Sequence, residues 1–186
     1  MTAAQLLRLS IPGKKHELVD GIVVEMEPPG WDHGVVQVAV GQLLRDHVRD
    51  RNLGVVTGEV GFLLRSDPDT VLAPDVAFVT RERADPVQGS PKYFPGPPDL
   101  AIEIVSPDDT RPKLRAKALD WLSWGTPAVL IIDAQRGHVT VYRAPDLVAT
   151  HTGDERVDLT GVVDGWAPTA TELIGGEPHP VAAPAS

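Results

Sequence analysis

The chain has 186 residues, of which 42% are hydrophobic and 23% are charged, and its formal net charge is −9. This length allows one compact domain with a substantial apolar core. The absence of cysteine excludes a disulfide framework, a cysteine-based zinc site and a thiol nucleophile. No apolar run reaches the ~18 residues of a membrane span, and no secretory signal is recognisable, so we expect a cytoplasmic protein without a membrane partner.

The negative charge is concentrated near the C-terminus. Residues 145–186 contain seven acidic residues and one basic residue, a net charge of −6, which leaves −3 for residues 1–144. An acidic chain is a poor general nucleic-acid binder, because phosphate contacts come mainly from Lys and Arg. We expect residues 1–144 to form the main domain, 145–174 an acidic extension packed on it, and 175–186 a disordered tail.

The first elements along the chain are a hairpin and a helix. Residues 16–26 contain two short apolar runs that meet at Asp20-Gly21, a strong hairpin signal. Asp32 is expected to cap the N-terminus of a helix that runs to about Arg51.

Strands dominate the rest of the main domain. The predicted elements are a strand over 55–64, a strand over 75–79, a long polar loop over 81–98, a strand over 99–105, a helix over 112–124, and strands over 128–132 and 137–143. Short strand-like pieces follow at 147–152 and 156–161. This order predicts an α/β or α+β fold, a mixed β-sheet flanked by helices with an N-terminal hairpin.

Two carboxylates stand in otherwise apolar strands. Glu103 lies in the run LAIEIV, and Asp75 begins the run DVAFV after Pro74. Burying a carboxylate costs several kcal/mol unless it is paired or binds a metal. Two such carboxylates suit a hard divalent cation. The alternatives are that Asp75 caps a loop and that Glu103 lies on the exposed face of an edge strand.

The helix over 112–124 begins with an acid-free run of bases: Arg111, Lys113, Arg115 and Lys117. Lys117 lies three residues after Leu114 and four before Trp121, so it borders the apolar stripe of this helix. Its ammonium either extends to solvent, which is the common behaviour of such a lysine, or reaches over the sheet toward Glu103.

These residues resemble a known family. Pro74-Asp75, Glu103 in an apolar strand, Ser106-Pro107 and Lys117 follow one another as in the PD-(D/E)XK nuclease superfamily, and more closely as in the Uma-two family of restriction-endonuclease-like proteins. The matching stretches, between residues 16 and 143, are HELVDGIVVEMEPPGWDHG, LAPDVAFV, PDLAIEIVSPDDT and KALDWLSWGTPAVLIIDAQRGHVTVYR.

The resemblance implies specific roles. Asp75 and Glu103 would hold a divalent metal, Mg²⁺ or Mn²⁺, with the backbone carbonyl of Ile104 as a third ligand. The superfamily's usual lysine lies two residues after the glutamate, where this chain has Val105, and the Uma-two pattern supplies it instead from the next helix, as Lys117. The family often has an acid four residues before that lysine, where this chain has Lys113.

The implied function is a metal-dependent endonuclease that hydrolyses DNA phosphodiester bonds, acting as a homodimer if it cuts both strands. The alternative is a nuclease-fold binding or assembly module whose site is idle. Residues assigned to substrate contact are Arg111, Lys113, Arg115 and His33. Glu59 is a possible extra acidic ligand, although a solvent-facing strand residue is the commoner reading.

Overall fold

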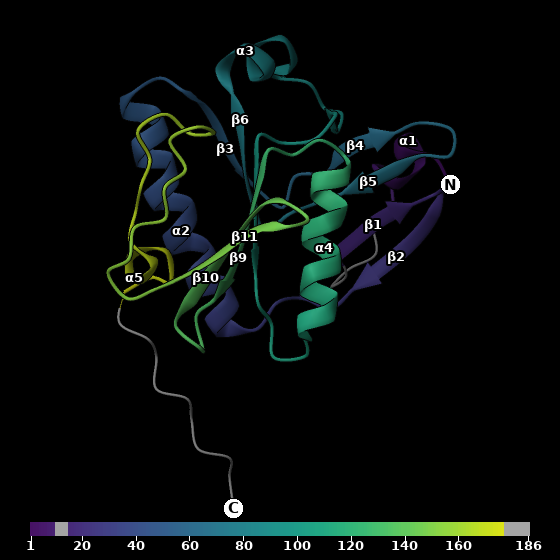
Figure 1. Ribbon diagram of the computed structural model, residues 1–186. Helices are drawn as coiled ribbons and strands as arrows, with labels where there is room; N and C mark the ends of the chain where they lie inside the picture. The colour runs from purple at the N-terminus through teal and green to yellow at the C-terminus, as the bar shows by residue number, and fades with distance from the viewer. Residues whose placement is uncertain (10–14, 177–186) are drawn as a thin grey trace, which may run out of the picture.

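The computed structural model of the chain describes residues 1–9 and 15–176 (Figure 1). In chain order, its elements are α1 (Ala3–Leu6), β1 (Lys15–Val19), β2 (Ile22–Met26), α2 (Trp31–Asp50), β3 (Gly54–Gly58), β4 (Phe62–Arg65), β5 (Thr70–Leu72), β6 (Val76–Thr80), α3 (Arg81–Ala84), the 3-10 helix η1 (Asp85–Val87), β7 (Phe94–Pro95), β8 (Leu100–Ile104), α4 (Arg111–Ser123), β9 (Ala128–Asp133), β10 (His138–Ala144), β11 (Leu147–Thr152) and α5 (Ala170–Leu173).

The strands form two sheets. The larger has six strands in the order β11-β10-β9-β8-β6-β3, and the smaller has five in the order β2-β1-β5-β4-β7. Strand β8 pairs antiparallel with β6 and parallel with β9, so the larger sheet is mixed. The predicted mixed α+β fold with flanking helices and an N-terminal hairpin is therefore confirmed, but the strands divide between two sheets.

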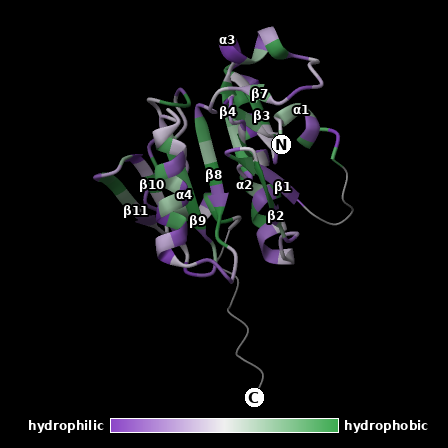
Figure 2. Cartoon of the chain, turned by 90° about the vertical axis from the view of Figure 1, so that its right-hand side faces the viewer, coloured by the Kyte–Doolittle hydropathy of each residue, from purple (hydrophilic) through white to green (hydrophobic). Residues whose placement is uncertain are grey.

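Helices cover both faces of the six-stranded sheet. Helix α2 packs on one face through Val36, Val40, Leu44 and Val48, together with α5. Helix α4 packs on the other face through Ala118 and Trp121. Figure 2 shows the central strand β8 between α4 and α2. Because strand side chains alternate between faces, successive residues of β8 enter two different apolar clusters.

The largest correction concerns the strand predicted over 55–64. It is two strands, β3 and β4, which belong to different sheets. Glu59 lies between them with φ +54°, a left-handed conformation that redirects the chain. After this change of direction, β4 pairs with β5 and β7 in the smaller sheet.

Other predictions need smaller corrections. The N-cap of α2 is Gly30, and Asp32 lies in the first helical turn, where its charge favours the helix dipole. The loop over 81–98 contains α3, η1 and β7. Residues 156–161 form no strand, because their only pairing is an isolated bridge from Arg156 to Thr169. The hairpin turn at Asp20-Gly21 is confirmed, with φ +52° and +77°.

Residues after β11 complete the core on the α2 side. Their buried side chains are Val157, Leu159, Val163, Trp166, Ala170, Leu173 and Ile174. Most of the tail predicted over 175–186 lies outside the described residues, which end at Gly176. Within residues 1–9 and 15–176, no helix combines the length and the apolar character needed to cross a membrane.

Candidate active site

Asp75 directly precedes β6, on the same sheet as β8. It is 6% exposed, and its Oδ2 accepts a hydrogen bond of 2.7 Å from the backbone N–H of Ile104. Its Oδ1 lies 3.3 Å from His33 Nε2 and 3.7 Å from Lys15 Nζ. Burial pulls the pKa of Asp75 upward, but the contacts with His33 and Ile104 outweigh burial and hold it below its ordinary value. Asp75 is therefore a buried carboxylate kept in its ionised form.

Glu103 lies in β8 and is 1% exposed. Its Oε1 accepts a hydrogen bond of 2.7 Å from the indole Nε1 of Trp121, and its Oε2 lies 2.6 Å from Lys117 Nζ. Burial raises the pKa of Glu103 to about 7, opposed by the cation of Lys117 and reinforced by the negative charge of Asp75. This carboxylate changes its charge near neutral pH, unlike Asp75.

Lys117 reaches the sheet from α4. Its side chain is 42% exposed, which keeps the stem on the helix border while the ammonium lies against Glu103. Burial disfavours the charge, but the Glu103 carboxylate outweighs burial and holds the pKa of Lys117 well above its ordinary value. Of the two alternatives for this lysine, the ammonium therefore reaches over the sheet to Glu103.

His33 and Glu59 also come close to Asp75, although differently. His33 is in the first turn of α2, and its Nδ1 is 3.1 Å from Ser106 Oγ while its Nε2 faces Asp75. Glu59 reaches Asp75 only through Lys15, whose Nζ lies 3.6 Å from Glu59 Oε1.

Sequence reasoning missed two side chains of this site. Glu17 on β1 is 8% exposed, and its Oε1 accepts a hydrogen bond of 2.8 Å from the backbone N–H of Ala73. Burial raises the pKa of Glu17, and Lys117, Lys15 and Asp75 all act on it electrostatically. Lys15 was not singled out either. The sequence feature that could have pointed to Glu17 is its place next to the apolar Leu18 in a predicted hairpin strand.

The other basic residues of α4 do not join the carboxylates. Arg111, Lys113 and Arg115 are exposed along the first turns of the helix, N-terminal to Lys117. None of the three makes an ion pair within the described part of the chain. They form an unneutralised basic surface beside the site.

The carboxylates of this site suit Mg²⁺ in their chemical type and in their number. No group of three or more Asp, Glu or His side chains at metal-binding distance occurs within residues 1–9 and 15–176. Mg²⁺, however, is usually bound by one or two carboxylates and keeps several waters. Asp75 and Glu103 supply two carboxylates, and each oxygen that accepts one hydrogen bond retains a further lone pair. The residues present therefore fit a divalent cation that is partly hydrated.

Comparison with known proteins places the chain in a family. Residues 3–172 match the Uma2 family model, described as "Putative restriction endonuclease". The chain belongs to the Uma2 family. The match extends at both ends beyond residues 16–143, which carry the resemblance in the sequence, and reaches into α5.

A solved structure supports the fold. It is described as a "putative nuclease belonging to DUF820" from Anabaena variabilis ATCC 29413, and it superposes with a TM-score of 0.78 at 21% sequence identity. The alignment covers 94% of this chain and 98% of that one. No curated protein matched the chain. At this identity, the similarity establishes the shared fold.

Proposed function

We propose that this Uma2-family chain is a nuclease that hydrolyses DNA phosphodiester bonds with the help of a divalent metal. The observation that carries the proposal is the meeting of three separate elements at one point. Asp75 before β6 and Glu103 in β8 are two buried carboxylates, and the partly exposed Lys117 in α4 adds an ammonium that contacts Glu103. Burying charge costs stability, so such a group is more typical of chemistry than of packing.

Asp75 and Glu103 would hold Mg²⁺ or Mn²⁺, with the carbonyl of Ile104. The backbone N–H of Ile104 donates to Asp75, and the N–H and C=O of one strand residue face the same neighbouring strand. The Ile104 carbonyl therefore faces the Asp75 side of β8. When bound, the metal supplies a Lewis acid for the phosphate and a bound water of lowered pKa.

The chain's own groups then orient and stabilise the reactants. Glu103 must be ionised to act as a ligand, so activity should rise with pH around its pKa of about 7. Lys117 stays protonated, so its ammonium stabilises negative charge that develops on the phosphate and orients the attacking water. His33 holds Asp75 in place, and the exposed bases Arg111, Lys113 and Arg115 contact the backbone of the substrate.

The test is cleavage of supercoiled plasmid and of single-stranded DNA in Mg²⁺ or Mn²⁺. The Asp75→Asn and Glu103→Gln variants should each lose at least ~1,000-fold in rate, and Lys117→Met ~100-fold or more. The exposed Arg51→Gln variant is the control and should cut as wild type does. Equal cutting by all variants would assign the activity to a contaminant and defeat the proposal.

A second candidate function is a nuclease-fold binding module with an idle site. Both oxygens of Glu103 already have partners inside the chain, Trp121 and Lys117, so the site is satisfied without a metal. Calorimetric titration with Mg²⁺ and Mn²⁺ separates the two functions. Millimolar metal that binds wild type but not Asp75→Asn favours the nuclease, and no binding favours the module.

The proposed nuclease would cut both strands of a duplex as a homodimer, because the two-fold symmetry of DNA is matched by two copies of one site. Sedimentation of the chain with a short duplex checks this. Two chains per duplex is the expected stoichiometry, and one chain per duplex would restrict the proposal to cleavage of one strand.

A further inference from the structure

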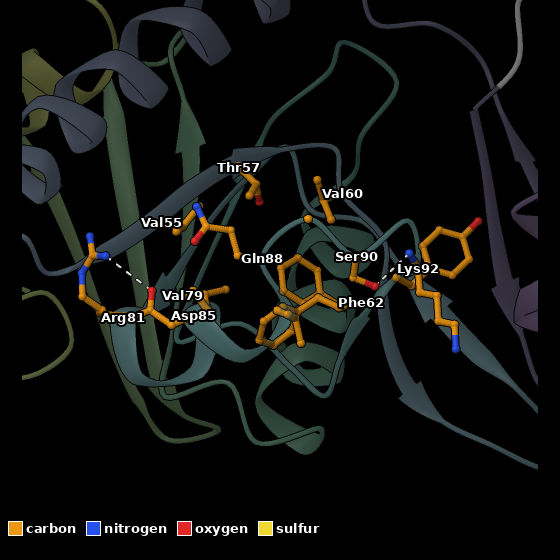
Figure 3. Close-up of a pocket in the computed structure, with 15 residues that line it drawn as sticks. Val55, Thr57, Val60, Phe62, Val79, Arg81, Asp85, Gln88, Ser90 and Lys92 are labelled. Atoms are coloured by element: carbon orange, nitrogen blue, oxygen red, sulfur yellow. Dashed lines mark hydrogen bonds and ion pairs between the residues drawn. The ribbon is translucent and has the colours of Figure 1, made fainter.

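A second concave site lies at the edge of the six-stranded sheet. It is a pocket of about 380 Å³ between strand β3 on one side and the segment from α3 to β7 on the other (Figure 3). We refer to it as the β3 pocket. The residues that line it include Thr57, Phe62, Gln88, Ser90, Tyr93 and Phe94. A volume of this size is typical of small-ligand sites.

Aromatic side chains form the inner walls of the β3 pocket. Phe62 is buried and packs at 5.4 Å between ring centroids against Phe94, which is only partly buried. The Tyr93 ring lies directly on the backbone of Gly61, where an added Cβ would come within 2.5 Å of it. Gly61 therefore allows a ring to stand close to the strand, and the pocket offers partly exposed aromatic surface.

Polar groups stand among these apolar walls. The hydroxyl oxygen of Thr57 is buried and has no hydrogen-bond partner in the described part of the chain. The side chains of Gln88 and Ser90 are exposed at the opposite wall (Figure 3). Lys92, also part of the lining, makes no ion pair within residues 1–9 and 15–176. The Ser90 hydroxyl accepts a hydrogen bond of 3.2 Å from the backbone N–H of Lys92, whereas Thr57 and Gln88 have no side-chain hydrogen bond among the described residues. Apolar faces with two such polar side chains suit a flat heterocycle with polar edges.

The β3 pocket adjoins the carboxylates along the strands. Thr57 pairs with Ala77 of β6, two residues beyond Asp75. At 3.2–3.4 Å per strand residue, that offset is about 7 Å. Side chains two residues apart share a face, and Ala77 belongs to the apolar cluster on the α4 side, so Asp75 and the pocket open on the same face of the sheet. Lys15 contacts both Asp75 and Glu59, the residue that follows β3.

We propose that the β3 pocket takes a nucleobase of the nucleic-acid substrate, from the nucleotide next to the phosphate held at Asp75 and Glu103. This proposal rests on the nuclease function proposed above. The base would lie against Tyr93 and Phe94, and Thr57 and Gln88 would hydrogen-bond to its edge. A base can enter such a pocket only when it is unstacked, so the substrate is single-stranded or locally opened at the cleavage point.

The first test is independent of cleavage. Amide signals of Thr57, Gln88 and Ser90 are followed by NMR during titration with the four deoxynucleoside 5′-monophosphates, and with deoxyribose 5-phosphate as the base-free control. At least one nucleotide should shift these signals at millimolar concentration, while the control leaves them in place. Shifts of equal size with deoxyribose 5-phosphate, or none with any nucleotide, would overturn the proposal.

The second test uses a variant that fills the mouth of the pocket. Gln88→Trp should weaken nucleotide binding at least tenfold and raise KM for single-stranded DNA by a similar factor, because the bound base would lose its stacking contacts. Glu82→Trp places the same side chain on an exposed site of α3 outside the pocket, and both constants should stay within twofold of wild type.

The two tests distinguish a failure of the base-binding proposal from a failure of the nuclease proposal. Wild type that cuts DNA while Gln88→Trp behaves as Glu82→Trp contradicts the pocket and leaves the nuclease intact. Wild type that binds nucleotides in the pocket but never cuts contradicts the nuclease and leaves the base site standing.

Discussion

The two faces of β8 carry residues of opposite character at equal depth. Ile102 is fully buried on the α2 side, and its neighbour Glu103 is equally buried on the α4 side. On the first face, burial is favourable at about 25 cal/mol per Å² of apolar surface. On the second, burial of a carboxylate is costly and is offset by Lys117 and Trp121. Burial alone therefore does not reveal a residue's role, because one strand buries an apolar side chain on one face and a paired carboxylate on the other.

The largest effect on stability should come from the apolar face. Ile102→Ala removes a fully buried side chain and leaves a cavity, so the free energy of unfolding should fall by about 4 kcal/mol. Urea unfolding measures this, with Val38→Ala at an exposed position of α2 as the control that changes it by less than ~0.5 kcal/mol. A loss below ~1 kcal/mol at Ile102 would contradict the assignment of this face to the core.

The second effect distinguishes the faces by pH. The pKa of Glu103, about 7 in the folded chain, lies above its ordinary value of 4.5. Between these values the folded state binds more protons than the unfolded state, so the free energy of unfolding falls as pH rises from 4.5 to 7. The loss should reach about 3 kcal/mol at pH 7 and above relative to Glu103→Gln, which lacks this titration.

Urea unfolding of both proteins across this pH range, with a chelator to remove divalent metal, measures the difference. The pKa of Glu17 is also raised by burial, so the comparison with Glu103→Gln matters and not the wild-type curve alone. Parallel curves for the two proteins would show that Glu103 keeps an ordinary pKa.

The third effect tests the support of Glu103 by Trp121. Trp121→Phe keeps an aromatic ring but removes the indole N–H that donates to Glu103 at 2.7 Å. The free energy of unfolding should fall by about 2 kcal/mol, the range for a hydrogen bond to a charged group. The same substitution in the Glu103→Leu background, where position 103 has no hydrogen-bond acceptor, controls for lost ring volume. Equal losses in both backgrounds would deny that the hydrogen bond matters.

The smallest effect concerns the exposed start of α4. Lys113→Gln should change the free energy of unfolding by less than ~0.5 kcal/mol, because Lys113 is exposed and makes no ion pair with the described side chains. It should still lower the salt dependence of DNA binding by about 0.9 in the slope of log K against log salt. An unchanged slope would remove Lys113 from the substrate surface, and Arg51→Gln serves as the control for general charge.

Sequence alone reached much of the site through residues that contradict their surroundings. Glu103 and Asp75 were recognisable as charges in apolar runs, and helical spacing put Lys117 at the edge of the buried stripe. These arguments depend on local pattern, which the chain displays directly. The roles of the three residues stay predictions, but their proximity is a property of the fold.

Other features depended on long-range geometry. The division of residues 55–64 between two sheets follows from one left-handed residue, Glu59, in a run that looks continuous. The burial of Glu17 is not visible in the sequence, because it depends on the contact of β1 with Ala73, 56 residues further along the chain. The hydrogen bond from Trp121 to Glu103 is not visible either, since no sequence pattern shows where an indole N–H points.

Lys117 is attached to Glu103 by packing and not by the backbone. A lysine at the position of Val105 would directly follow the strand that carries Glu103, so covalent geometry would fix the separation of the two residues. Here the distance of 2.6 Å between Lys117 Nζ and Glu103 Oε2 depends on how Ala118 and Trp121 pack α4 against the sheet. A small slide of this helix would separate ammonium from carboxylate while every residue of the site remained present. Substitutions beneath α4 could therefore alter the contact between Lys117 and Glu103. A comparison of the site residues alone would not detect such a change.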